Sequence, residues 1–258
     1  MNPAQYPMLV FVIAFIALWL SAWIGWWFRK RQGALDEELR EDFGFILAAT
    51  LTLLGLIIGF SFSMATSRYD QRKNYEEAEA NAIGTEYVRV DFLPEADAAR
   101  TRELLRKYLN ERVLFYKAFY EQDIGQINDR TTKLQTELWS AIRAPAAANP
   151  TPVMALVVSG MNDVLNSQGY TQAGYWNLIP TAAWGLMVAI AVGCNLLVGY
   201  GSRSAKAGSK LLPILPLVVA VAFMLIADID SPRRGIIRVS PQNLTSLAES
   251  LQPPGGVH

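Results

Sequence analysis

Cysteine and histidine are nearly absent from this chain of 258 residues, which has one of each. A single cysteine, Cys194, cannot form a disulfide within the chain or a cysteine-based zinc site. The one histidine, His258, is the last residue, so catalytic triads and zinc sites built on histidine are excluded in practice. We therefore expect no enzyme active site, no metal and no cofactor.

The chain also has no net charge, because 23 basic residues balance 23 acidic ones. No basic block is long enough to indicate binding of nucleic acid. Residues 66–177 mix 13 basic with 15 acidic residues, which predicts a solvated surface rather than one that binds a polyanion.

Long uncharged runs are what the sequence does contain, and 52% of its residues are hydrophobic. Three runs are long enough to cross a hydrocarbon core of about 30 Å, namely Met8–Phe28, Phe43–Ser67 and Leu178–Tyr200. A fourth, Leu211–Ala227, has only 17 residues and predicts a short span. We therefore predict an all-α, multi-pass protein of the cell (inner) membrane, whose lipid bilayer surrounds four transmembrane helices.

The second uncharged run continues without a Gly-Pro break into a charged, helix-favouring run that ends near Pro94. This continuity predicts one long helix that crosses the membrane and extends into water. The chain is then divided into transmembrane helices 1 and 2 (1–67), an extramembrane helical domain (68–177), transmembrane helices 3 and 4 (178–229) and a C-terminal tail (230–258).

The extramembrane domain is expected to contain helices alone. Apolar residues at helical spacing predict one helix that includes Leu105 to Phe119 and another that includes Ile127 to Ile142, separated at Gly125. The proline-rich segment 144–152 predicts a linker, because proline interrupts helices. A further helix is predicted from Pro152 to near Gly169.

Two smaller expectations concern the ends of this domain. The tail predicts a short helix from Asn243 to Leu251. Near the membrane, three glutamates lie beside two basic residues, which predicts an ordinary solvated helix face. These residues are Arg72, Lys73, Glu76, Glu77 and Glu79.

The second span has two neighbouring stripes of different character. Gly55, Gly59 and Ser63 repeat at i, i+4 and i+8, a spacing of small residues that lets another helix approach closely. Leu56, Phe60 and Met64 repeat with the same spacing and bulky apolar groups. This bulky stripe has two interpretations, ordinary packing or a hydrophobic constriction of a pore that gates by dewetting. In the second case the small residues are the packing face between subunits.

Two polar residues inside the third span, Cys194 and Asn195, are interpreted as a hydrogen-bonding pair between helices rather than as a transport site. Four spans place the exits of the second and fourth spans on the same membrane face, which also carries both termini and the helical domain. Charged residues at these exits are expected to form a collar, in which Arg68 meets Asp228 or Asp230, and Asp70 meets Arg233 or Arg234. The collar has three interpretations, which are interfacial anchors, structural ion pairs or direct handling of ions.

Basic residues near the spans bear on which face this is. The loops 29–42 and 203–210 together carry seven basic residues, and the opposite face carries six. The numbers decide little, and the uncharged N-terminal tail favours a domain outside the cytoplasm.

Two motifs and the four-span layout resemble the bestrophin-like domain family of bacterial membrane proteins. The motifs are GLIIGFSFSMATSRYDQRKNYEEAEANAIGTEYVRVDFLP and DIDSPRRGIIRVSPQNL, which together with the layout cover most of the chain. One departure is Ser231, which stands where the family pattern leads us to expect a basic residue.

The resemblance implies kinship to bestrophins, which are homopentameric anion channels with a helical cytosolic domain between spans two and three. It implies that Leu56, Phe60 and Met64 form an apolar neck, and it places the domain in the cytoplasm, opposite to the charge count. The leading hypothesis is a homo-oligomeric, passive anion channel of the chloride type. The alternative is a non-conducting scaffold or signalling protein whose helical domain recruits a partner.

Overall fold

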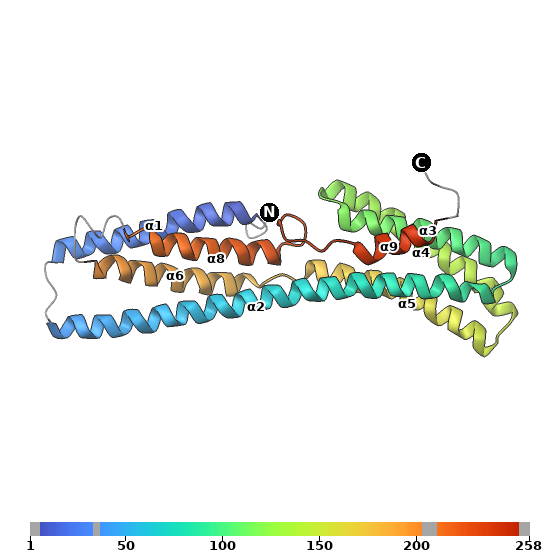
Figure 1. The fold of residues 1–258 in the computed structure, drawn as a ribbon, viewed down its shortest axis with the longest axis horizontal. Coiled ribbons are helices and arrows are strands. Elements are labelled where there is room, and N and C mark those ends of the chain that lie inside the picture. Colours follow the sequence, from blue (N-terminus) through green and yellow to red (C-terminus); the bar gives the residue numbers. More distant parts are fainter. Residues whose placement is uncertain (1–5, 33–36, 203–210, 253–258) are drawn as a thin grey trace. The chain divides into compact units, whose positions relative to one another are not determined.

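The computed structural model describes residues 6–32, 37–202 and 211–252, and its secondary structure within these ranges is helical throughout (Figure 1). The predicted all-α class is confirmed. The chain forms two compact units, one made of residues 1–69 and 178–238, the other of residues 70–177 and 239–258. The 53-residue helix α2 (Glu37–Arg89) contributes to both units.

The first unit contains the apolar helices. Besides the first part of α2, these are α1 (Pro7–Gln32), α6 (Thr181–Gly201) and α8 (Ile214–Asp230). Among the described residues, three helical stretches are long and apolar enough to cross a membrane, namely Pro7–Arg31, Leu39–Phe92 and Pro152–Gly201. Helix α8, with 17 residues, is the short fourth apolar helix.

Helices α1 and α6 are in backbone contact through two glycines. A Cβ atom on Gly25 would overlap the carbonyl oxygen of Leu196, and a Cβ atom on Gly199 would overlap that of Ala22. Ser21 Oγ donates a hydrogen bond to the Val192 carbonyl at 2.8 Å. Small residues therefore allow the backbones of this pair to approach closely.

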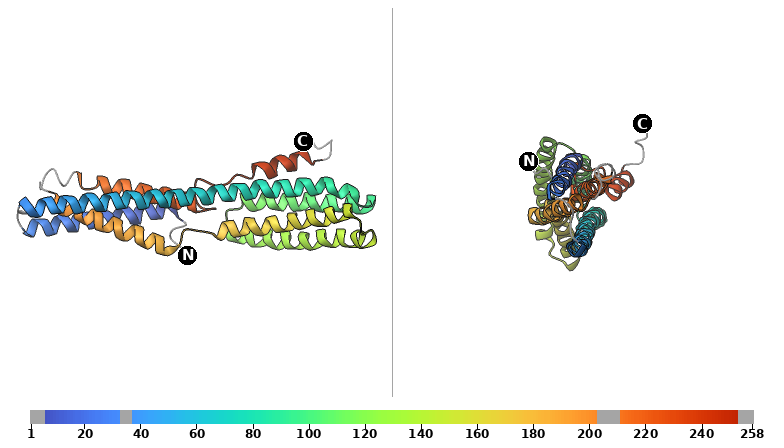
Figure 2. Two further views of the ribbon diagram at one scale, coloured as in Figure 1. Left: turned by 90° about the horizontal axis from the view of Figure 1, so that it is seen from below. Right: turned by 90° about the vertical axis from the view of Figure 1, so that its left-hand side faces the viewer.

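The second unit is a helical bundle (Figure 2). It combines the second part of α2 with a 3₁₀ turn at Val90–Phe92 and four further helices. These are α3 (Glu95–Lys117), α4 (Glu121–Ala148), α5 (Pro152–Trp176) and the short α9 (Gln242–Ser250). Its core is apolar, with fully buried side chains that include Ile83, Leu105, Phe115, Leu138, Val157 and Met161.

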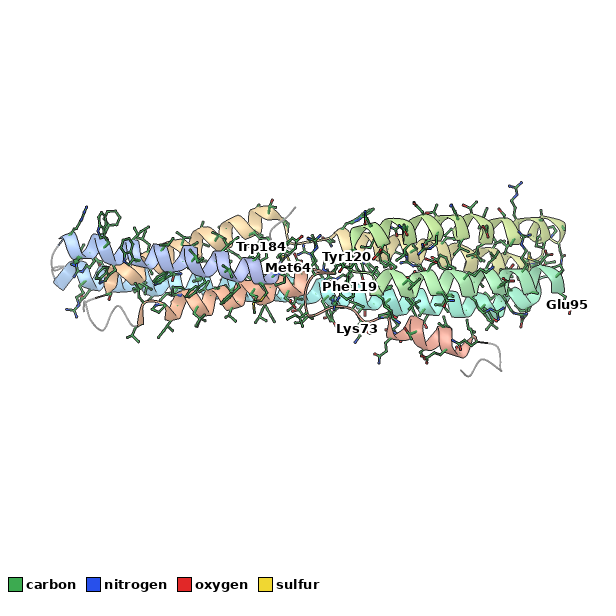
Figure 3. The ribbon with its side chains drawn as sticks, turned by 90° about the horizontal axis from the view of Figure 1, so that it is seen from above. Met64, Lys73, Glu95, Phe119, Tyr120 and Trp184 are labelled. Atoms are coloured by element: carbon green, nitrogen blue, oxygen red, sulfur yellow. The ribbon has the colours of Figure 1, made fainter. Side chains whose placement is uncertain are left out.

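Three predicted boundaries in this bundle were wrong. The chain leaves the helical conformation at residues 118–120, near the labelled Phe119 and Tyr120 (Figure 3), and Gly125 lies inside α4. The predicted linker at 144–152 is mostly helix, because α4 continues through Pro145 to Ala148 although proline has no N–H for the carbonyl of Ala141. Helix α5 continues past Gly169 to Trp176. The predicted tail helix is confirmed as α9.

The most deeply buried positions of α2 in the second unit follow a spacing of alternately four and three residues. They are Arg72, Glu76, Glu79, Ile83, Glu86 and, in the 3₁₀ turn, Val90, all at most 2% exposed. Such spacing keeps one stripe of a helix against its neighbours. Most of this stripe is charged, so the predicted solvated face was wrong for Arg72, Glu76 and Glu79. Only Lys73 and Glu77 of that group are exposed.

An ion pair between α2 and α3 lies at the centre of the bundle. The Arg112 Nε–H donates a hydrogen bond to Glu79 Oε1, and both side chains are fully buried. The second oxygen, Glu79 Oε2, accepts from Thr171 Oγ1 of α5 at 3.0 Å and from the Tyr116 hydroxyl at 3.4 Å. Burial alone would lower the pKa of Arg112, but the adjacent carboxylate raises it above its ordinary value. Three helices are thus joined through one carboxylate.

Glu76 connects α2 to α9 in a similar way. Its Oε1 accepts a hydrogen bond from the Leu244 N–H at 2.9 Å, and its Oε2 accepts one from Asn243 Nδ2 at 2.6 Å. The first turn of α9 leaves main-chain N–H groups without partners in the helix, and a carboxylate there is favourable.

Glu79→Gln is expected to destabilise the protein strongly, because it leaves the Arg112 charge buried without its counter-ion. Removing one partner of a buried pair costs about 3–5 kcal/mol. Thermal unfolding of the detergent-purified protein measures the effect. The exposed neighbour provides the control, Glu77→Gln, which should change the free energy of unfolding by less than about 0.5 kcal/mol. Equal melting temperatures for the two variants would contradict a structural role for the pair.

Glu86 is buried with neither carboxyl oxygen hydrogen-bonded to any described residue. Burial raises its pKa from 4.5 to about 8, although nearby Arg89 acts to lower it, and Asp163 raises it further. Gly160 of α5 makes the room, since a Cβ atom there would overlap Glu86 Oε2. The folded protein therefore keeps a proton on Glu86 that the unfolded chain releases above its own, lower pKa.

Replacing this carboxyl with an amide predicts a specific pH effect. The stability that the bound proton contributes is present below about pH 4.5 and is lost as the pH rises to about 8. Glu86→Gln mimics the protonated form, so its melting temperature should match that of the wild type at low pH and exceed it increasingly up to about pH 8. A difference that stays constant over this range would show that Glu86 is already ionised in the folded protein.

Candidate functional site

The bulky stripe of α2 lies on a face that the rest of the chain leaves uncovered. Leu56, Phe60 and Met64 are 52%, 64% and 39% exposed, and Met64 is labelled in Figure 3. Only 6% of the most apolar window of α2 is buried, compared with 22% for α1. Helix α2 thus contributes few buried side chains to the core of the first unit, chiefly Leu54 and Ala65.

The neighbouring stripe of small residues is uncovered as well. Gly55, Gly59 and Ser63 are exposed, and a Cβ atom on either glycine would meet no described atom within 4 Å. The close helix contact within the chain is made instead by α1 and α6, at Gly25 and Gly199. Sequence reasoning missed these two, although Ser21 precedes Gly25 by four residues, the spacing of small residues that also marks close packing.

The collar is built around the C-terminal end of α8. Arg68 Nη1 lies 3.7 Å from Asp230 Oδ1, with the two side chains 15% and 7% exposed. The other oxygen, Asp230 Oδ2, accepts a hydrogen bond from the Ile179 N–H at 2.9 Å, just before α6 begins. Asp230 therefore combines an ion pair with a main-chain contact.

The carboxylate of Asp228 accepts hydrogen bonds from the main chain. Its two oxygens accept from the N–H groups of Ile236 and Ile237 at 2.7 and 2.8 Å. These bonds fold the segment after α8 back onto the helix end, and Gly235 is required there because a Cβ atom would overlap the Asp228 carbonyl oxygen. Sequence reasoning expected ion pairs and missed this function, for which the signal was an aspartate followed seven residues later by glycine.

The other three collar residues, Arg234, Arg233 and Asp70, differ in their surroundings. The Arg234 guanidinium lies 4.3 Å from the centre of the Tyr6 ring, a cation–π contact. Its main-chain N–H donates to Ser231 Oγ at 3.4 Å. Arg233 is half-buried in the same turn, and Asp70 belongs to the second unit and is exposed.

The two polar residues of α6 behave differently from each other. Cys194 Sγ donates to the Thr50 carbonyl of α2 at 3.2 Å, so it links two helices. Asn195 Nδ2 donates to Ala191 of its own helix at 2.8 Å, and its buried Oδ1 has no partner among the described residues. No group of three or more potential metal ligands occurs within the described ranges.

These features define a helical membrane protein with an uncovered apolar helix and a charged turn at the end of its last apolar helix. The chain matches the model of the Bestrophin-like domain over residues 13–244 and therefore belongs to that family. None of the curated protein sequences matches it.

Solved structures agree with this fold. A crystal structure of a bacterial bestrophin homologue from Klebsiella pneumoniae superposes with a TM-score of 0.61 at 14% identity, covering 95% of this chain and 97% of the other. A second structure of a bacterial bestrophin homologue from that organism gives 0.59 at 14% identity, with 95% of both chains covered. A crystal structure described as a membrane protein gives 0.61 at 13% identity, with 98% of both chains covered.

Gly235→Ala is expected to destabilise the protein by about 1–3 kcal/mol, because the added methyl group forces the turn away from Asp228. Gly185→Ala is the matched control, since a Cβ atom at Gly185 of α6 meets no described atom within 4 Å. Thermal unfolding in detergent compares the two variants. A Gly235→Ala protein as stable as the control would show that the turn does not need the close approach.

Proposed function

We propose that this protein is a homo-oligomeric channel that conducts anions passively, with α2 next to the conduction pathway. The observation that carries the proposal is the uncovered apolar face of α2, a helix with only 6% of its most apolar stretch buried in the described structure. Membership of the Bestrophin-like family supports the same conclusion.

The two uncovered stripes of α2 fit a ring of identical subunits. Gly55 and Leu56 are adjacent residues, about 100° apart around a helix of 3.6 residues per turn. When the small stripe packs against a neighbouring copy, the bulky stripe can therefore face the axis of the ring. Leu56, Phe60 and Met64 from each copy then form an apolar constriction, which controls flow by excluding water.

The finer features follow from the family relation. We propose five copies, as in bestrophins, in the inner membrane of the cell, with both termini on the same face as the helical domain. The family relation favours a cytoplasmic domain, whereas the uncharged N-terminal tail favours the opposite orientation.

In this proposal the collar is structural. Asp228 and Asp230 are held by main-chain N–H groups, and Arg68 lies beside Asp230. Both aspartates carry the same sign of charge as the conducted ion, so they repel a passing anion rather than bind it. The collar then holds the start of α6 and the end of α8 in place. The constriction, not the collar, controls the passage of ions.

Phe60→Ala is expected to raise anion flux several-fold, because it widens the constriction and reduces its tendency to exclude water. The measurement is chloride efflux from liposomes that contain the purified oligomer. Phe62→Ala is the matched control, since Phe62 is 44% exposed on the same helix but lies about 200° away from Phe60. It should leave the flux unchanged.

Two results would contradict the channel. One is the absence of any anion flux from an oligomer that remains intact in the liposomes. The other is cross-linking in native membranes that yields a constant second protein and no ring of self-contacts, which would favour the scaffold or signalling hypothesis.

A further inference from the structure

A cavity of about 390 Å³ lies in the first unit, where α1 ends and α2 begins. Its wall also includes the end of α6 and the residues just before α8. The lining is partly basic and partly apolar, and its main members are Arg29, Arg40, Phe43, Leu47, Val198 and Leu212. The volume lies within the range of about 300–1,000 Å³ that is usual for small-molecule sites.

The basic part of the cavity has no acidic residue beside it among the described residues that line the wall. The Nη1 atom of Arg29 is buried and has no hydrogen-bond partner among the described residues. The Arg29 guanidinium lies 5.7 Å from the centre of the Tyr200 ring, a cation–π contact that occupies none of its N–H donors as a hydrogen bond would. A buried guanidinium donor without a partner is costly, and an anion would satisfy it.

The residues beside the cavity are of the kinds expected at the level of lipid headgroups. The last turn of α1 carries Arg29, Lys30 and Arg31. Lys30 lies 5.5 Å from the Trp26 ring, and Arg31 lies 3.5 Å from the Trp27 ring. Tryptophan beside basic residues at the end of an apolar helix is typical of the membrane–water interface.

We propose that this cavity binds the phosphate group of an anionic phospholipid. Arg29 and Arg40 donate hydrogen bonds to the phosphate oxygens, as guanidinium groups do at other phosphate sites. The apolar side chains of Phe43, Leu47 and Leu212 contact the glycerol and the first part of an acyl chain. This apolar wall favours a lipid over free inorganic phosphate, which would leave it in contact with water. The site is independent of ion conduction, so the channel proposal and this one can fail separately.

A thermal-shift experiment on the detergent-purified full chain tests the site. Phosphatidylglycerol or cardiolipin is expected to raise the melting temperature saturably, whereas phosphatidylethanolamine is not. Arg29→Gln/Arg40→Gln should raise the half-saturating lipid concentration at least roughly tenfold, because two charge-assisted contacts are lost. The matched control is Lys30→Gln/Arg31→Gln, which removes the same charge from the same interface but not from the cavity, and which should leave the value unchanged.

A second pair of variants serves if the double arginine variant does not fold. Gly44 lines the cavity, and a Cβ atom there meets no described atom within 4 Å, so a side chain fits without strain from its surroundings. Gly44→Asp places a negative charge at the site and should weaken lipid binding much more than the similarly sized Gly44→Asn.

Three outcomes would overturn the proposal. One is the absence of any shift with anionic lipid. Another is equal weakening in the cavity and control variants, which would mean general attraction to a charged surface. The third is a saturable shift with inorganic phosphate that lipid does not exceed, which would assign the cavity to a free anion.

Discussion

The buried charged stripe of α2 is the feature on which the second unit depends. A helix that packs at its core positions through Glu76, Glu79 and Glu86 gains little from the hydrophobic effect at those positions. Two of these residues, Glu79 and Glu76, have specific partners instead, namely Arg112, Thr171 and the first turn of α9. Such contacts need correct geometry, because a misplaced partner leaves a buried charge unsatisfied. The bundle therefore gains a defined helix register from groups that are costly to bury.

In both units, carboxylates accept hydrogen bonds from main-chain N–H groups. Glu76 accepts a main-chain N–H at the start of α9, Asp230 accepts one just before α6, and Asp228 accepts two in the turn after α8. In each case a negative charge satisfies main-chain donors that no helix carbonyl can reach. The sequence suggests that these acidic residues lie on the surface or form ion pairs. In the structure, Glu76, Asp228 and Asp230 instead connect a helix to main-chain N–H groups of another segment.

Sequence patterns predicted the helical class and the apolar runs, because length and the absence of charge decide whether a helix suits the bilayer. They failed where tertiary contacts override local preference. Glu79 looks solvated because nothing near it in sequence reveals Arg112, which lies on another helix. Pro145 was taken for a helix breaker, but α4 runs through it to Ala148 at the cost of the hydrogen bond that its missing N–H cannot make. The uncovered stripes of α2 were visible as patterns, but their exposure became known only from the structure.

The glycine contact between α1 and α6 has a consequence for biosynthesis. Gly25 leaves the ribosome about 170 residues before Gly199, which at roughly 5–20 residues per second is a delay of about 10–35 s. Throughout that time α1 lies in the bilayer without the partner whose backbone it will touch. Its uncharged run and its flanking tryptophan and basic residues favour stable insertion of α1 as a single helix. Packing of α1 against α6 is then a late event, which begins only when about three-quarters of the chain has been made.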